Sequence, residues 1–218
     1  MTNPNRTHIT AVIDRSGSMA SLTSDTIGGF NKFISDQRSA PGEATITLVL
    51  FNGNYEVVYD ARPVKEVEDL NPSVYRANGN TALYDALGKA IQTTGASLSA
   101  LPEENRPGTV IVLVITDGEE NTSREFAGEA GRQKVQTMVQ HQTDTYKWTF
   151  VFMGANIDAR AVGTSLGVAA VNTRNYAANS MGVAASYESI SRGVISRRKS
   201  PSSNADFFDT PDTVLGKD

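Results

Sequence analysis

Three side chains that carry oxygen occupy alternate positions directly after an apolar run near the amino terminus. The run covers residues 8–13, and Asp14, Ser16 and Ser18 follow it in the stretch Asp-Arg-Ser-Gly-Ser-Met. In an extended loop, alternate side chains point the same way, so these three oxygens can converge on one point. An aspartate followed by serines is by itself more often a cap or a turn, so the chemistry depends on what else comes near it.

Two further oxygen donors stand next to other predicted elements. Asp117 closely follows the apolar run 109–115, and Thr81 stands just before the helical pattern that starts at Leu83. Parallel strands end at one edge of a sheet, and in doubly wound folds ligands bind at that edge where the strand order reverses. The sequence therefore predicts one site made by Asp14, Ser16, Ser18, Thr81 and Asp117.

The types of these donors indicate a hard divalent cation. The chain has no cysteine and two histidines, His8 and His141, which excludes thiolate sites and argues against a histidine-rich metal site. Magnesium takes about six oxygen ligands and keeps several waters, whereas calcium often takes more ligands, including bidentate carboxylates. Three hydroxyls and two carboxylates form a sparse set that balances a divalent charge. We expect magnesium, with calcium as an alternative, and an ion that can accept a further carboxylate from another molecule.

Strands and helices that could position these side chains alternate along the chain. Apolar runs predict strands over 8–13, 45–51, 109–115 and 148–153, a hairpin partner at 55–59 and a last edge strand at 168–171. Helical periodicity predicts helices around 27–34 and over 83–101, 125–142, 158–166 and 179–199. This alternation produces right-handed crossovers. We therefore expect an α/β fold with a doubly wound, mostly parallel sheet of about six strands, one antiparallel edge strand, and helices on both faces.

The length and composition predict one domain and a tail. We expect the domain over residues 7–198 and a polar tail, rich in Ser, Pro and Asp, over 199–218. Phe207 and Phe208 are the exception in this tail. They could bind a partner, but the cost of exposing two aromatic rings favours packing back on the domain.

The charge of the chain argues against polyanionic partners. Twenty basic and 24 acidic side chains give a formal net charge of −4, so the basic excess that binds nucleic acid or an anionic membrane is missing. Arg197, Arg198 and Lys199 suit the carboxyl end of a helix, where the macrodipole favours cations, better than a functional basic patch. A polar start and short apolar runs predict neither a signal peptide nor a membrane span, so we expect a cytoplasmic location.

Patterns typical of enzymes are present only in part. A phosphatase of the haloacid dehalogenase type needs a second aspartate two residues after its nucleophile, and Ser16 stands there. Residues 163–167 match the hydrolase pattern G-x-S-x-G, but they end a helical pattern and no histidine follows Ser165, so Gly167 is better explained as a helix cap. No glycine-rich phosphate-binding motif follows a predicted strand, and neither histidine has an evident catalytic neighbour. We therefore expect no enzymatic activity.

At the five predicted ligands, the sequence resembles the von Willebrand factor type A (vWA) domain with its metal-ion-dependent adhesion site (MIDAS). Asp14, Ser16 and Ser18 match the family pattern D-x-S-x-S, Thr81 matches its threonine, and Asp117 matches the aspartate of its third loop. The motifs occur in the family's order, with no departure at a ligand position. The similarity extends over about residues 7–195 and looks most like free-standing prokaryotic members, which phages also encode.

The resemblance implies a Rossmann-like sheet, a magnesium or manganese ion, and a protein partner whose Asp or Glu completes the coordination. It also implies that ligand occupancy is coupled to movement of the last helix, over about 179–199. Asp85, Glu119 and Glu120 are candidates for orienting ligands or waters, and a solvated rim fits the two glutamates almost as well.

We therefore expect a metal-dependent protein-binding module for adhesion or assembly. The alternative is a structural or virion component whose metal site is vestigial or stabilising. A metal-dependent phosphatase is the less favoured reading, because it lacks its second aspartate.

Overall fold

The computed structural model describes residues 2–200 and 206–208 of the chain. The sheet contains β1 (Asn3–Asp14), β2 (Glu43–Phe51), β3 (Tyr55–Pro63), β4 (Pro107–Thr116), β5 (Thr149–Gly154) and β6 (Thr173–Asn175). The α-helices are α1 (Thr23–Ser39), α2 (Leu83–Ser99), α3 (Gly128–Tyr146), α4 (Ala159–Ser165) and α5 (Ser180–Lys199). Short 3-10 helices lie at Gly17–Leu22 (η1), Val64–Glu66 (η2), Glu103–Asn105 (η3) and Ala170–Asn172 (η4).

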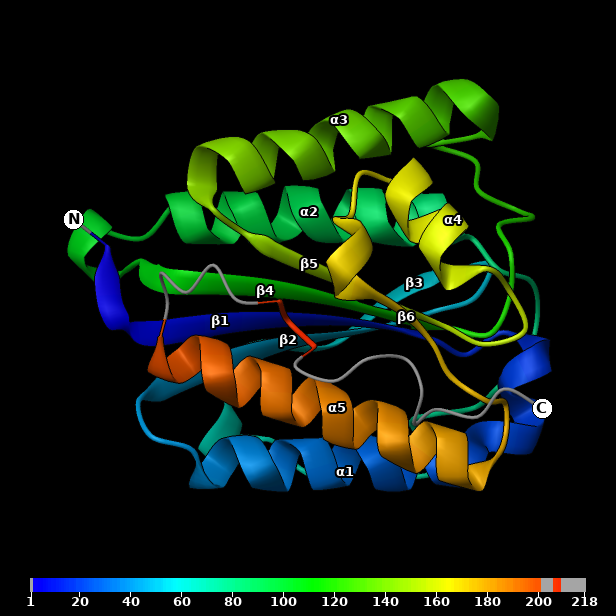
Figure 1. The fold of residues 1–218 in the computed structure, drawn as a ribbon, viewed down its shortest axis with the longest axis horizontal. Helices are drawn as coiled ribbons and strands as arrows, with labels where there is room; N and C mark the ends of the chain where they lie inside the picture. The colour runs from blue at the N-terminus through cyan, green and yellow to red at the C-terminus, as the bar shows by residue number, and fades with distance from the viewer. Residues whose placement is uncertain (1, 201–205, 209–218) are drawn as a thin grey trace.

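The sheet is mixed, and its strand order reverses at the centre. The order is β3-β2-β1-β4-β5-β6, in which only β3 runs antiparallel to its neighbour (Figure 1). β1 pairs with β2 on one side and with β4 on the other, where Ile13 lies opposite Ile115. The predicted Rossmann-like, doubly wound sheet with one antiparallel edge strand is confirmed, and the carboxyl ends of β1 and β4 form its switch point.

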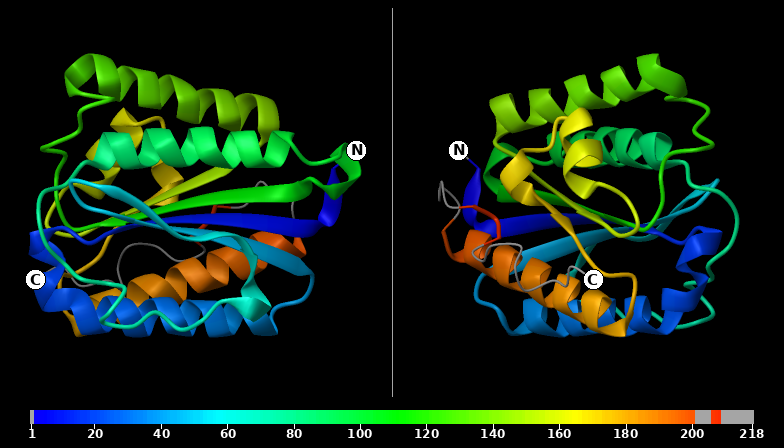
Figure 2. Two further views of the ribbon diagram at one scale, coloured as in Figure 1. Left: turned by 180° about the vertical axis from the view of Figure 1, so that it is seen from behind. Right: turned by 45° about the vertical axis from the view of Figure 1, so that its right-hand side comes forward.

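Helices cover both faces of this sheet. α1 and α5 lie on one face, and α2, α3 and α4 lie on the other, as Figure 2 shows from two further directions. The central strands are apolar at almost every position because alternate residues serve the two layers. In β4, Ile111, Leu113 and Ile115 belong to the core with α1 and α5, and Val110, Val112 and Val114 belong to the core with α2 and α3.

The predicted edge strand at 168–171 is wrong. The last strand is β6, Thr173–Asn175, and η4 occupies Ala170–Asn172 before it. Val168 is apolar because its side chain is buried in the core beside α3 and α4, whereas Val171 is exposed. The apolar spacing therefore reflects one buried loop residue, and pairing with β5 begins only at Thr173.

Several predicted boundaries also shift. β1 starts at Asn3 and not at residue 8, and α2 ends at Ser99, which leaves Leu101 partly exposed beyond it. α3 covers Gly128–Tyr146 in place of the predicted 125–142. Its start is delayed because backbone N–H groups of residues 124–126 donate to the Asp85 carboxylate, which holds them in a loop.

The pattern G-x-S-x-G lies at the end of a helix. Ser165 is the last residue of α4, and its hydroxyl donates to the carbonyl of Val162. Gly167 has φ +87°, the left-handed conformation that favours glycine after a helix. The interpretation of Gly167 as a cap is confirmed, and Ser165 has none of the context of a nucleophile elbow.

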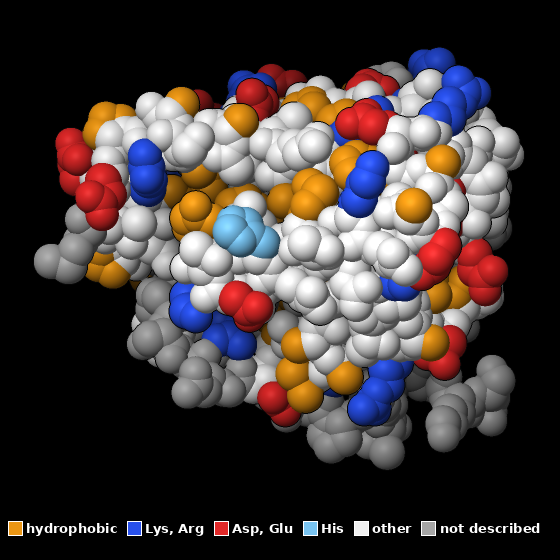
Figure 3. All heavy atoms as spheres, turned by 90° about the horizontal axis from the view of Figure 1, so that it is seen from above, with side chains coloured by type: hydrophobic (Ala, Val, Ile, Leu, Met, Phe, Trp, Pro, Cys, Tyr) orange, Lys and Arg blue, Asp and Glu red, His pale blue; other side chains and the backbone are white. Residues whose placement is uncertain are grey.

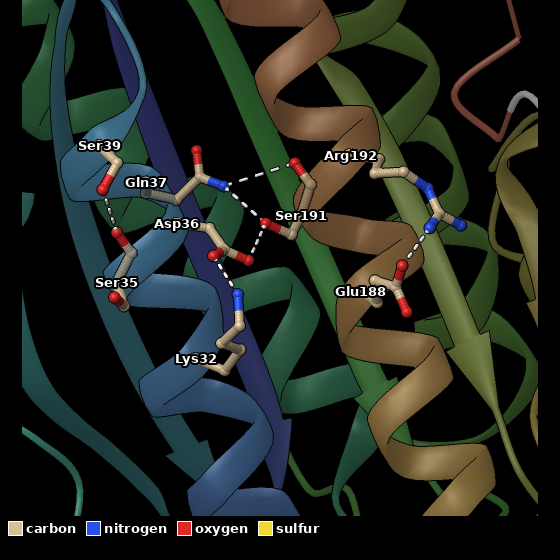
Figure 4. A network of polar contacts seen from close by, with 8 residues as sticks. All are labelled: Lys32, Ser35, Asp36, Gln37, Ser39, Glu188, Ser191 and Arg192. Atoms are coloured by element: carbon tan, nitrogen blue, oxygen red, sulfur yellow. Dashed lines mark hydrogen bonds and ion pairs between the residues drawn. The ribbon is translucent and has the colours of Figure 1, made fainter.

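A polar contact between α1 and α5 holds the last helix in place. Figure 4 shows its centre, where the Ser191 hydroxyl donates to Asp36 Oδ2 (2.9 Å) and the buried Gln37 amide donates to Ser191 Oγ (3.3 Å). Further along α5, the buried guanidinium of Arg198 donates to the Gln37 side chain and to the carbonyls of residues 37, 40, 41 and 42. Arg198 therefore caps the carboxyl end of α1, in addition to lying in the last turn of its own helix.

The aromatic pair of the predicted tail packs back on the domain. Phe207 and Phe208 are 2% and 7% exposed and belong to the core beneath α5. A Cβ built on Gly193 would lie 2.5 Å from the Phe207 ring, so glycine is needed there, and the Arg174 guanidinium lies 4.3 Å from the centre of the Phe208 ring. This prediction is confirmed, while residues 201–205 and 209–218 of the tail lie outside the described residues.

The two histidines lie away from the sheet's carboxyl edge. His8 is buried in β1 between the hydroxyls of Thr45 and Thr10, and burial lowers its pKa to about 4. His141 lies exposed on α3, against the Tyr146 ring. Within the described ranges, none of the helices combines the length and the apolar character needed to cross a membrane.

Candidate metal centre

The loop after β1 carries three of the predicted ligands. Asp14 ends the strand with no exposed surface, and the Ser16 N–H donates to its Oδ1 (2.6 Å). Ser16 is extended, but the chain then turns into η1, so the loop is not extended throughout as the sequence pattern assumed. This turn brings Ser18 Oγ to 3.1 Å from Ser16 Oγ, and the predicted convergence results from the bend.

The loop after β4 joins this group from the neighbouring strand. Ser18 Oγ donates to Asp117 Oδ1 (2.6 Å), and the buried Thr116 hydroxyl donates to Asp14 Oδ2 (2.5 Å). Because β1 and β4 are adjacent and parallel, both aspartates reach the same edge of the sheet.

Thr81 completes the group from the loop before α2. Its N–H donates to Asn121 Oδ1 (2.9 Å), and its carbonyl accepts from the Asn121 N–H (3.0 Å), which ties it to the loop after β4. A Cβ built on Gly118 would lie 3.4 Å from Thr81 Oγ1 and 3.7 Å from Ser18 Oγ. Because Gly118 has no side chain, space remains beside these two hydroxyls. The structure thus brings all five predicted residues together at one edge of the sheet.

The electrostatics of the site disfavour the ionised forms of both carboxylates when no cation is bound. Burial raises the pKa of Asp14 to about 6, against hydrogen bonds from Thr116 and Ser16, and the charge of Asp117 adds to the rise. Burial also raises the pKa of Asp117, against its hydrogen bond from Ser18. Neither carboxylate forms an ion pair with a described residue, and the nearby Arg15 pairs with Glu56 (2.6 Å). A divalent cation would supply the missing positive charge.

The donor set fits a hard cation with oxygen ligands. Among the described residues no three His, Cys, Asp or Glu side chains cluster as metal ligands, which agrees with a site that takes three of its five side chains from hydroxyls. Ser18 is exposed, whereas Asp14, Ser16, Thr81 and Asp117 are buried. Such a site keeps both anions inside and presents the Ser18 hydroxyl outward, and its oxygen donors suit magnesium or manganese better than a softer metal.

Supporting residues hold the ligands, and sequence reasoning missed several of them. The Tyr75 hydroxyl donates to the Asp14 carbonyl (2.6 Å), and the Asn52 carbonyl accepts from the Ala82 N–H (2.8 Å). Asn121 and Thr116 act as described above. Thr116 could have been noticed as a polar residue that ends a buried strand beside Asp117, but Asn52, Tyr75 and Asn121 carry no local signal.

Two of the three acidic side chains proposed to orient the site instead organise the loop after β4. Asp85 is capped by three N–H groups from residues 124–126, which holds its pKa low against the effect of burial. Glu120 accepts from the N–H groups of Tyr84, Thr122 and Ser123. Glu119 is exposed and lies on the rim. Asp85 and Glu120 thereby fasten this loop to the start of α2, next to Thr81.

Replacing Thr116 by valine is expected to weaken magnesium binding about 10- to 100-fold, because the hydroxyl that orients Asp14 is lost while the side-chain volume is kept. Isothermal titration calorimetry measures the dissociation constant. Thr109→Val is the matched control on the same strand, because the Thr109 hydroxyl is buried without a hydrogen-bond partner in the described structure. Equal affinities of the two variants would contradict the assigned role of Thr116.

Comparisons with known proteins agree with this architecture. The family model of the von Willebrand factor type A domain matches residues 8–177. Among solved structures, a von Willebrand factor type A protein from Catenulispora acidiphila is similar over 87% of this chain and 43% of its own, at 15% identity and TM-score 0.57. The ArnB paralog VWA2 from Sulfolobus acidocaldarius is similar over 85% and 44%, at 15% identity and TM-score 0.55.

A third similar structure is the manganese-loaded TRAP protein of Plasmodium vivax, over 84% of this chain and 72% of that one, at 13% identity and TM-score 0.54. The chain spans less than half the length of the first two structures. No curated protein sequence gave a significant match. At these identities the structural likeness shows the fold, and the family model covers the three loops that carry the site.

Proposed function

Because this chain belongs to the von Willebrand factor type A family, we propose that it is a divalent-metal-dependent protein-binding module. In this proposal Asp14, Ser16, Ser18, Thr81 and Asp117 hold magnesium or manganese, directly or through water. The observation that carries it is the convergence of these side chains at the β1–β4 switch point, with two buried carboxylates that have no cationic partner among the described residues.

The partner in this proposal presents an aspartate or glutamate. When bound, the cation would act as an electrophile for that carboxylate, since the five residues of the site include only two anions. The exposed Ser18 and the open space beside Gly118 support access from solvent. The manganese-loaded state of the similar TRAP protein supports manganese as an alternative ion.

The proposal is tested by capturing partners from the native source. The wild-type protein and Asp14→Ala are each used with magnesium and with a chelator, and bound proteins are identified by mass spectrometry. We expect partners only with wild type and magnesium. Partners retained equally in all four conditions would overturn metal-dependent docking and favour an assembly role that does not use the ion.

The proposal includes no catalytic activity. Ser16 stands where a haloacid dehalogenase phosphatase needs its second acid, and its N–H donates to Asp14. An assay with p-nitrophenyl phosphate and magnesium is expected to show no turnover above that of Asp14→Ala. Turnover abolished by Asp14→Ala would establish an enzyme instead.

A further inference from the structure

A cavity of about 300 Å³ lies at the edge of the sheet opposite the candidate metal centre. It opens between the carboxyl ends of α2 and α3, near the start of β1 and β4. Figure 3 shows the molecule from the side of these helices, with apolar side chains recessed among polar ones. Leu98, Val110 and Trp148 give its wall an apolar surface, and Tyr146, His141 and Arg106 add polar groups. Cavities of this size and character bind small organic molecules.

Trp148 supplies a ring surface and a free donor. It is the one tryptophan of the chain, it is 6% exposed, and its ring stacks on Phe150 with centroids 6.2 Å apart. Its indole N–H donates to none of the described residues, and solvent can reach it. The ring that carries this N–H lines the cavity.

Arg106 makes the cavity attractive to an anion. Its Nε donates to the Leu101 carbonyl (3.0 Å) and its Nη2 to the Ser99 carbonyl (2.8 Å), which holds the guanidinium in place and leaves Nη1 without a partner in the described part of the chain. The described lining contains no carboxylate. Glu103 interacts electrostatically with Arg106, but it is fully exposed and does not line the cavity. On a chain of net charge −4, this is a local positive site.

Gly95 keeps part of the cavity empty. It lies inside α2, where glycine costs about 1 kcal/mol relative to alanine. A Cβ built there would meet only the Trp148 ring, at 4.0 Å, which is an ordinary contact. Packing therefore does not require glycine, and a larger side chain at this position would project into the space that a ligand would use.

We infer that this cavity binds a small aromatic carboxylate, with its ring against Trp148 and its carboxylate on Arg106 and the indole N–H. The aromatic wall favours a flat apolar body, and the donors without acceptors favour an anionic end. This site is independent of the proposed metal-dependent docking, because it lies at the other edge of the sheet.

The test follows the single indole N–H signal of the full-length, ¹⁵N-labelled protein in two-dimensional NMR. The probe is 2-naphthoate, and 2-naphthamide is its neutral analogue of the same shape. We expect the indole signal to shift saturably with naphthoate, and the amide to bind at least tenfold more weakly. No saturable shift with naphthoate, or equal affinity for the two probes, would overturn the inference.

Two pairs of variants locate the binding. Gly95→Met is expected to weaken naphthoate binding at least tenfold, whereas Gly28→Met, at an exposed glycine of α1 with open space around it, should bind as wild type. Arg106→Gln should remove the preference for naphthoate over naphthamide, and Asp14→Asn should keep it. Wild-type affinity in Gly95→Met, or an unchanged preference in Arg106→Gln, would overturn the site.

Discussion

Replacing Asp14 by asparagine is expected to abolish magnesium binding and, without metal, to make the protein more stable. The substitution removes one of two anionic ligands, so the site can no longer balance a divalent charge. It also removes a carboxylate that burial disfavours in its ionised form, while asparagine keeps the shape and can still accept the Ser16 N–H at Oδ1. Loss of function and gain of stability from one change would mark a residue kept for binding and not for folding.

The size of the stability gain follows from the pKa of Asp14. A rise from 3.8 to about 6 corresponds to about 3 kcal/mol of unfavourable free energy at pH 7. Since the folded protein binds a proton more readily than the unfolded chain, this penalty is present above pH 6 and vanishes below about pH 4. The stability difference between Asp14→Asn and wild type should therefore shrink as the pH falls through this range.

Urea unfolding with a chelator measures the stability difference, and calorimetry measures magnesium binding. Asp60→Asn serves as the control, because Asp60 is exposed on β3, and it should change neither quantity. An Asp14→Asn protein that binds magnesium as wild type does would refute the assigned ligand. A metal-free variant less stable than wild type at pH 7 would refute the electrostatic argument.

Replacing Arg198 by methionine is expected to destabilise the protein by about 3 kcal/mol or more. The guanidinium donates five hydrogen bonds to α1 and to the turn after it, including bonds to the buried Gln37. Methionine retains the apolar stem, so the loss measures the unpaired acceptors and not a cavity. Among these acceptors, the Gln37 carbonyl belongs to the last turn of α1, whose carbonyls have no partners within their own helix. The carbonyls of residues 40, 41 and 42 lie directly after the helix.

Lys199→Met is the matched control for this prediction. Lys199 is the next residue, it is exposed, and the substitution should change stability by no more than about 0.5 kcal/mol. Urea unfolding curves with unchanged slopes would give both values. Similar effects of the two substitutions would show that Arg198 acts through general charge at the helix end and not through its contacts with α1.

The sheet and the convergence of the five predicted side chains could be predicted from sequence because their signals are local. Central strands such as β4 are apolar at most positions, and each predicted ligand stands within a few residues of a strand end or a helix start. Parallel strands then bring those ends to one edge whatever the details of the loops. Even so, Ser18 reaches Asp117 through a turn of 3-10 helix that the alternating pattern did not predict.

Residues that act across long distances in sequence could not be predicted in this way. Asn121 holds Thr81 from 40 residues away, and Tyr75 reaches the Asp14 carbonyl from 61 residues away. The residues adjacent to Asn121 and Tyr75 in sequence give no indication of these hydrogen-bond partners. The prediction of an edge strand at 168–171 was wrong because a local signal was misleading. Val168 is apolar because it packs against helices, and it does not pair with a strand.

The pairing of β1 with β4 also determines when the metal centre can form. Thr116 donates to Asp14 across 102 residues of sequence, and Thr81 comes from a third distant segment. Contacts of such separation form late, because a long loop must close before they contribute. A cation that requires them stabilises the native state more than the folding transition state. Magnesium should therefore slow unfolding in stopped-flow experiments and leave the refolding rate nearly unchanged, so the bound ion would extend the lifetime of the folded protein without speeding its formation.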